Sequence, residues 1–339
     1  MCGVSDGGGR YLLHESIVGV CAVVLGLMLA WACGITVFPQ AAFAEQAAAA
    51  DSEADKLPDP EDVTLETDDG VTIEATYYGS LQGKNAVPII LLHGYKGDRR
   101  DFDELALYLQ NLGHAVIAPD LRGHGDSTRL VRNGSTINLD SSRLRKDDIQ
   151  AMSGLGGDVE CVKRFLMRKN NAGELNIEKL CVIGADMGAT VALYWAGRDW
   201  SLPLLPGRKQ GQDVKALVLI SPQWSFKGIP ISVPLNLRPI ERELSMMMIV
   251  GTGDSTSLSG AKRIHNTLKK YRTAPPADPK EAKDKQDLFF TTPDTILSGA
   301  KMLSEKSLNL NSKIATFIDW RLVRKKFAWT DRKSKLEAE

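Results

Sequence analysis

The chain has 339 residues, 43% of them hydrophobic, and its 42 basic residues balance its 42 acidic residues. This is enough chain for a single domain with a full hydrophobic core. The balanced charge argues against a nucleic-acid partner. No cofactor motif and no metal-ligand spacing occur in the sequence, so we predict neither a cofactor nor a metal.

The N-terminal segment, residues 1–44, contains an uncharged run over 17–38, with Arg10 before it and Ala42-Phe43-Ala44 after it. This pattern is typical of a cleaved secretory signal peptide. The run is also long enough to be an uncleaved membrane anchor. Both interpretations predict an exported protein in the periplasm, the cell envelope or outside the cell, with membrane contact only through this segment if it is uncleaved. Residues 45–62, rich in alanine, acidic residues and proline, are predicted to form a flexible linker.

Beyond residue 62, apolar runs alternate with amphipathic segments. We predict a hairpin over 63–67 and 71–78, and further strands over 87–92, 114–118, 214–220, 246–250 and 288–291. Helices are predicted over 101–112, 158–169, 258–271 and 312–323, and residues 180–196 are predicted to form a strand, a sharp turn and a helix. Such alternation indicates a mostly parallel, doubly wound α/β sheet with helices on both faces. Ligands bind such sheets beyond the C-terminal ends of the strands.

The turn within 180–196 has the sequence Gly184-Ala185-Asp186-Met187-Gly188. This is the spacing of the G-x-S-x-G nucleophile elbow, with aspartate at the serine position. Glycine is needed on both sides because other side chains would collide at a strained strand-to-helix turn. Asp186 then has two interpretations. It is either a nucleophile held ionised near a helix N-terminus, or simply the N-cap of that helix.

Two further motifs precede the elbow, namely HGYKG at 93–97 and PDLRGHGDS at 119–127. In this order and spacing, over about residues 63–322, the sequence resembles the α/β-hydrolase fold family, in particular its lysophospholipase and esterase members. The resemblance implies an eight-stranded sheet in a domain over 63–323. It also implies that Asp254 orients a catalytic histidine, and that the N–H groups of Tyr95 and Met187 form an oxyanion hole. The cleft would be lined by His93, Gly94, His124, Gly184 and Gly188.

The sequence departs from the family where that catalytic histidine is expected. The segment 290–299 contains none, and no histidine follows His265. A serine nucleophile needs a base to take its proton, whereas an aspartate is already ionised. Dehalogenase and epoxide-hydrolase relatives of the family use aspartate at the elbow, with a histidine-activated water, a tryptophan after the aspartate and a large helical cap. Here Met187 follows Asp186, and only about 23 residues separate Pro222 from Met246. We therefore predict a short flap in place of a cap.

Three functions stay open. The absent histidine favours an exported protein without efficient catalysis that binds a small-molecule or lipid-like ligand, or a partner, in the former active-site cleft. The second function is ester or acyl hydrolysis, with Asp186 as nucleophile and Asp254 as its catalytic partner. The third is a structural role in the cell envelope.

Three remaining features complete the predictions. The C-terminal segment, residues 324–339, is basic and is predicted to be a solvated tail, with weak contact to anionic lipid as the alternative. The proline- and charge-rich segment 273–287 is predicted to be an exposed loop. Cys161 and Cys181 are predicted to be core residues, and a disulfide between them stays open.

Overall fold

The computed structural model describes residues 56–203, 205, 209–275 and 277–333. The chain divides at Lys56, and the unit Leu57–Glu339 carries the fold. The predicted signal peptide or anchor lies outside the described residues. Among the helices that are described, none has the length and apolar composition needed to cross a bilayer.

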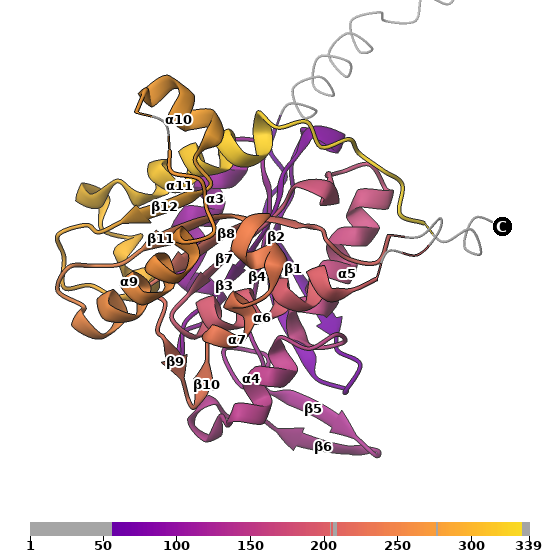
Figure 1. Cartoon of the computed structure of the whole chain (residues 1–339). Helices are drawn as coiled ribbons and strands as arrows, with labels where there is room; N and C mark the ends of the chain where they lie inside the picture. Colours follow the sequence, from indigo (N-terminus) through magenta and orange to yellow (C-terminus); the bar gives the residue numbers. More distant parts are fainter. Residues whose placement is uncertain (1–55, 204, 206–208, 276, 334–339) are drawn as a thin grey trace, which may run out of the picture. The chain divides into compact units, whose positions relative to one another are not determined.

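The described residues form a mostly parallel, eight-stranded sheet, as predicted (Figure 1). Its strands stand in the order β1-β2-β4-β3-β7-β8-β11-β12. β2 pairs antiparallel with β1 and with β4, and the other pairings are parallel. The strands are β1 (Glu61–Glu66), β2 (Thr72–Tyr78), β3 (Pro88–Leu92), β4 (Ala115–Pro119), β7 (Leu180–Ala185), β8 (Val214–Ile220), β11 (Ser245–Ile249) and β12 (Leu288–Thr291).

Helices cover both faces of the sheet, which explains why the parallel strands are apolar at consecutive positions. In β3, Ile90 and Leu92 belong to one buried cluster, while Ile89 and Leu91 belong to the other. Side chains of α5 (Asp158–Asn171), α6 (Met187–Ser201) and α9 (Ser255–Lys269) join the first cluster. Those of α3 (Asp103–Asn111) and α11 (Leu310–Ile318) join the second, so these two helices lie on the opposite face (Figure 1).

Two connections shape the surroundings of the site. Between β4 and α5 the chain forms a hairpin, β5 (Arg129–Arg132) and β6 (Ser135–Asn138), and then α4 (Lys146–Met152), none of which was predicted. The short flap between β8 and β11 contains β9 (Ser225–Phe226), β10 (Ile229–Pro230), α7 (Ser232–Leu235) and α8 (Arg238–Arg242). The remaining single turns are η1 (Gly83–Asn85), η2 (Arg99–Phe102), η3 (Ser141–Arg143), η4 (Ile177–Lys179), η5 (Gly299–Met302), η6 (Lys306–Leu308) and the π-helical η7 (Asp319–Val323).

Two segment predictions need correction, and one open question is answered. The predicted linker 45–62 extends too far, because β1 already begins at Glu61 and the Nε2 atom of Gln110 donates a 2.8 Å hydrogen bond to the carbonyl of Pro58. The segment 273–287 is not entirely loop, since it contains α10 (Pro279–Lys285). Cys161 and Cys181 are buried, as predicted, and both are free thiols.

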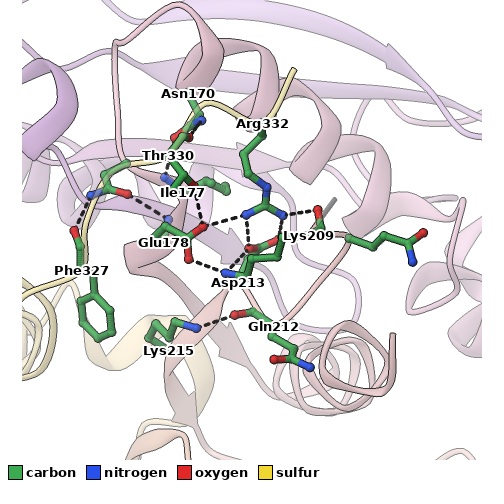
Figure 2. A network of polar contacts seen from close by, with 12 residues as sticks. Asn170, Ile177, Glu178, Lys209, Gln212, Asp213, Lys215, Phe327, Thr330 and Arg332 are labelled. Atoms are coloured by element: carbon green, nitrogen blue, oxygen red, sulfur yellow. Dashed lines mark hydrogen bonds and ion pairs between the residues drawn. The ribbon is translucent and has the colours of Figure 1, made fainter. Parts of the chain in front are cut away.

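The prediction of a solvated C-terminal tail is wrong for residues 324–333, which we call the strap. The strap crosses the domain from η7 towards α5 (Figure 1). Two buried asparagines bind its backbone: Asn176 donates to the carbonyl of Phe327 at 2.9 Å, and Asn170 to that of Thr330 at 3.0 Å (Figure 2). The side chain of Arg332 is only 5% exposed.

Arg332 is held by a buried network of charges (Figure 2). Its Nη1 atom lies 2.8 Å from Oδ1 of Asp213 and 2.9 Å from Oε1 of Glu178, and its Nη2 atom donates to the carbonyl of Lys209 at 2.8 Å. Burial alone would raise the pKa of Asp213, but Lys163, Arg332 and Lys209 outweigh it and hold that pKa below its usual value. The ion pairs of the buried Arg332 guanidinium with Asp213 and Glu178 therefore fix the strap to the domain.

Candidate active site

The elbow between β7 and α6 has the strained backbone that the glycine pattern predicts. Asp186 adopts φ 49° and ψ −110°, a conformation that is costly for a residue with a side chain. A Cβ atom on Gly184 would lie 2.3 Å from the carbonyl oxygen of Gly188, and one on Gly188 would lie 2.1 Å from that of Leu92. Only glycine fits at both positions, so β3, β7 and α6 meet closely enough to present Asp186 at the end of the sheet.

The carboxylate of Asp186 occupies the oxyanion-hole position. Its Oδ2 atom accepts the backbone N–H of Tyr95 at 3.3 Å, and the carboxylate also accepts the N–H of Met187. Nε2 of Gln223, which follows β8, donates to Oδ1 at 2.7 Å. The two N–H groups that the resemblance assigns to an oxyanion hole therefore converge on the protein's own side chain.

This geometry does not support the interpretation of Asp186 as a helix N-cap. Asp186 is the residue before α6, but its side chain accepts no capping hydrogen bond there. A capping side chain would accept the N–H of the second or third helical residue. The carboxylate instead turns towards the HGYKG loop and Gln223.

The environment of Asp186 disfavours its charged form. Burial raises the pKa of this carboxyl, although the N–H groups of Tyr95 and Met187 oppose the effect. The negative charge of Asp254 raises it further, while the hydrogen bond from Gln223 lowers it. The net result is a pKa above the usual aspartate value, which is typical of a carboxyl held in a functional site.

Asp254, which follows β11, has a serine as its partner. Its Oδ2 atom accepts the hydroxyl of Ser298 at 2.5 Å, and its Oδ1 atom caps α9 by accepting the N–H of Ser257 at 3.1 Å. Burial would raise the pKa of Asp254, but these hydrogen bonds outweigh it and lower the pKa below its usual value. Ser298 thus makes the hydrogen bond to Asp254 that the family resemblance assigns to the catalytic histidine.

The described histidines lie outside this arrangement. His93 is fully buried; its Nε2 atom accepts the N–H of Leu121 at 2.9 Å, and burial lowers its pKa to about 4. His124 packs against His93, with ring centroids 4.9 Å apart, and burial lowers its pKa as well. His265 lies on α9 beside Phe290, with ring centroids 5.0 Å apart. His114 immediately precedes β4, at the opposite end of that strand from the site.

A cavity of about 300 Å³ opens over Asp186. Its floor and walls come from the HGYKG loop, the elbow and the start of η5, and its lining includes Gly94, Tyr95, Asp186, Ser298 and Gly299. Lys96, Asp101 and Lys301 also line it and are exposed to solvent. His93, His124, Gly184 and Gly188, which were predicted to line the cleft, are not among the residues that line this cavity. In the described part of the chain, no group of three His, Cys, Asp or Glu side chains is arranged to hold a metal ion.

A family model described as the alpha/beta hydrolase fold matches residues 87–237, which include β3, the HGYKG loop and the elbow. Together with the strand order and the structural likeness given below, this match decides the fold. The chain is an α/β-hydrolase-fold protein. Its sheet, its elbow and its short flap all lie where that fold places them.

The curated relatives match only part of this α/β-hydrolase-fold chain. Epoxide hydrolase 3 of Siraitia grosvenorii is 26% identical over 198 residues, which are 57% of this chain and 52% of that protein. An uncharacterized protein of Mycobacterium tuberculosis is 29% identical over 142 residues, 42% of this chain and 43% of its own length. The chain thus spans about half the length of these curated relatives.

Among solved structures, an esterase of Pyrococcus furiosus is similar with a TM-score of 0.55 and 16% sequence identity, covering 78% of this chain and 91% of the esterase. At this level of identity the likeness shows the fold alone.

Two contacts of the site were not predicted. Gln223 lies in the flap and carries no motif, and only its position directly after a strand end could have drawn attention to it. Ser298 lies in the segment that was searched for a histidine, and the serine itself was overlooked.

Proposed function

We propose that this protein does not turn over acyl substrates and instead binds a small ligand in the cavity above Asp186. The observation that carries the proposal is the position of the Asp186 carboxylate, which accepts the N–H groups of Tyr95 and Met187. Acyl transfer needs those donors free, because they must stabilise negative charge developing on a substrate oxygen. The Asp186 carboxylate, which already accepts these N–H groups, would oppose the build-up of negative charge on a substrate oxygen at the same place.

The residues that the structure places around Asp186 support the same proposal. Ser298 takes the hydrogen bond of Asp254, and a hydroxyl cannot act as a general base near neutral pH. Water entering the cavity would find no imidazole among the described lining residues to accept its proton.

The chemistry of the cavity indicates the kind of ligand. A carboxylate offers about four acceptor positions, and the hydrogen bonds from Tyr95 and Gln223 leave part of this capacity on Asp186 unused. The remaining capacity can accept a hydroxyl or amine of a ligand. We therefore expect a ligand that brings a hydrogen-bond donor to the floor of the cavity, and polar groups that suit Lys96 and Lys301 at its rim.

Glycerol monobutyrate tests the proposal because it carries both hydroxyl donors and an ester bond. We expect saturable binding of this compound to the full chain in isothermal titration, without release of butyrate in a pH-stat. Asp186→Asn should weaken binding, whereas Lys262→Gln, on the exposed side of α9, should not. Steady butyrate release that is abolished by Asp186→Ala would contradict the proposal. Absence of binding would favour a structural envelope role.

A second candidate function is a single covalent reaction with an epoxide. It is favoured by the aspartate at the elbow and by the similarity to an epoxide hydrolase. A carboxylate oxygen of Asp186 would form a bond to a ring carbon, the ring C–O bond would break, and the released alkoxide would take a proton from water. Without a base to activate a second water, the ester would persist.

Intact-mass measurement distinguishes this candidate. The full chain incubated with 1,2-epoxyhexane should gain the mass of one epoxide, located on the peptide containing Asp186. Asp186→Asn should gain none there. Steady diol formation would show a complete catalytic cycle, and equal labelling of the wild type and Asp186→Asn would reject the candidate.

A further inference from the structure

The end of the sheet opposite Asp186 gathers the loops that precede β3, β4 and β7, together with the strap. Ser80 donates to the carbonyl of Gly113 at 2.8 Å, and the Nζ atom of Lys84 lies 3.9 Å from the ring centroid of Trp329. Asn176, just before β7, binds the strap. We call this surface the strand-start face and define it as residues 79–86, 108–114, 172–179 and 324–333.

The strand-start face exposes large apolar side chains. Leu81 is 48% exposed, Leu112 is 52% exposed, and Tyr108, one helical turn before Leu112, is 37% exposed. The Ser80–Gly113 hydrogen bond holds the loop of Leu81 beside the end of α3 that carries Leu112. Single exposed leucines are ordinary, but a group of them on one face indicates a contact surface.

The same face also carries basic side chains. Within the described part of the chain, Lys326 and Lys333 are exposed and have no acidic partner, and Lys84 lies over an aromatic ring. The acidic side chains of the face are mostly paired: Glu174 with Lys169, and Glu178 with Lys209 and Arg332. Asp331, which accepts the N–H of Lys333, is the exception. Exposed basic and apolar side chains on one face are typical of a surface that binds anionic lipid, because the charges attract the headgroups and the apolar side chains enter the interface.

The first residues of the domain lie at the same face. Pro58 packs against Gly79, where its Cγ atom lies 3.4 Å from the position of a glycine Cβ, and its carbonyl accepts the side chain of Gln110. The uncharged run 17–38 ends about 19 residues earlier in the sequence, a length that spans at most roughly 65 Å when fully extended. A membrane holding that run would therefore keep Pro58 within this distance.

We propose that the strand-start face rests on an anionic lipid surface. Leu81, Tyr108 and Leu112 would lie at the level of the headgroups, and Lys84, Lys326 and Lys333 would lie over their negative charges. The cavity at Asp186 opens at the other end of the strands, so it would face away from the membrane. This inference does not depend on what the cavity binds.

Hydrogen exchange on the full chain in lipid nanodiscs tests the proposal. Peptides from 79–86, 108–114 and 324–333 should exchange more slowly in discs containing phosphatidylglycerol than in discs of phosphatidylcholine alone. High salt should remove the difference, because it screens charges that face solvent. Peptides from 94–101, at the cavity, should be unaffected. Equal exchange in both discs, or protection centred on 94–101, would overturn the proposal.

Charge variants provide the matched comparison. The double variant Lys326→Glu, Lys333→Glu should weaken the contact by about tenfold or more, since each basic residue near an anionic surface contributes substantially. The control is Lys262→Glu, Lys306→Glu, two exposed lysines outside the strand-start face, which changes the net charge equally. Leu81→Ser, Leu112→Ser should weaken the contact without altering any charge of the face. If the control loses protection as strongly as the strap variant, the effect is one of overall charge and the proposal fails.

Discussion

The hydroxyl of Ser298 donates a 2.5 Å hydrogen bond to Oδ2 of Asp254, and Ser298 lines the same cavity as Asp186. Asp186 follows β7, Asp254 follows β11, and Ser298 lies in the segment after β12, so the three side chains come from the segments to which the family resemblance assigns the nucleophile, the orienting acid and the histidine. Two of the three are chemically unable to perform Ser-His-Asp chemistry. The backbone of the elbow has the strained turn of a nucleophile elbow, with an aspartate at the serine position.

The first prediction follows from this arrangement. Combining Asp186→Ser with Ser298→His should create ester hydrolysis, because the hydroxyl leaves the N–H groups of Tyr95 and Met187 free and the imidazole can bind Asp254. Each single variant should stay near background. Hydrolysis of p-nitrophenyl butyrate by the double variant should exceed that of either single variant by about 100-fold, the usual contribution of a positioned base.

The control for this prediction is Asp254→Asn added to the double variant, which should remove most of the gain because the imidazole loses the group that orients it. A folded double variant without activity would mean that Ser298 does not stand where a base is needed.

The second prediction concerns the pH dependence of stability. Because burial raises the pKa of Asp186 in the folded protein, the folded state binds more protons than the unfolded state between the two pKa values. Stability contributed by this group therefore falls as pH rises through that window. Asp186→Asn, which carries no charge, should be more stable than the wild type at pH 7 by up to about 1 kcal/mol. The advantage should vanish below the ordinary aspartate pKa.

Asp254 provides the opposite case within the same site. Hydrogen bonds from Ser298 and Ser257 lower its pKa, so its ionised form stabilises the fold above the ordinary aspartate pKa. Asp254→Asn should be less stable than the wild type at pH 7, and the deficit should shrink as pH falls. Urea unfolding of both variants from pH 3 to 8 checks the two signs. Curves that move in the same direction would show that the two carboxyl environments have been assigned wrongly.

Much of the fold could be predicted because parallel strands buried on both faces have a distinctive composition. β8 and β12 fall on their predicted ranges, and the elbow was located by two glycines with a clear steric reason. The hairpin β5–β6 could not be predicted, because its residues are mostly exposed and polar and lack a clear alternation. Short elements of this kind are determined by the rest of the domain rather than by their own sequence.

The position of the strap and several hydrogen bonds of the site depend on residues that are far apart in the sequence. Arg332 in a basic segment resembles a solvated charge until Asp213, 119 positions earlier, is placed beside it. The roles of Gln223 and Ser298 likewise become apparent only once their hydrogen bonds to Asp186 and Asp254 are known. The motif residues could be predicted, but the hydrogen bonds that decide the chemistry of Asp186 could not.

The third prediction tests the strap. Arg332→Ala should lower the free energy of unfolding by about 2 kcal/mol, because it leaves buried carboxylates without one of their partners. Lys163 and Lys209 remain beside Asp213 and limit the loss. Arg332→Lys should be intermediate, since one ammonium group cannot reproduce the contacts of a planar guanidinium.

The matched control for the strap is Lys333→Ala, whose exposed side chain should change stability by less than about 0.5 kcal/mol. Trypsin should cleave Arg332→Ala after Lys325 and Lys326 faster than the wild type, because the strap is released. Equal stability and equal cleavage of the Arg332→Ala and Lys333→Ala variants would mean that the network does not hold the strap.

The last prediction tests the elbow itself. Gly188→Ala places a Cβ atom 2.1 Å from the carbonyl oxygen of Leu92 and 2.6 Å from that of His93. Both contacts are with backbone, so β3 and the HGYKG loop must move away from α6. We expect a loss of about 3 kcal/mol, the upper part of the usual cost of overpacking. The N–H of Tyr95 should also move away from Asp186, which NMR would detect as a shift of the Tyr95 amide. Gly79→Ala is the control, because its new Cβ would meet Pro58 at an ordinary 3.4 Å. A Gly188→Ala variant as stable as Gly79→Ala would contradict the close approach of β3 and α6 that places Asp186 beside Tyr95.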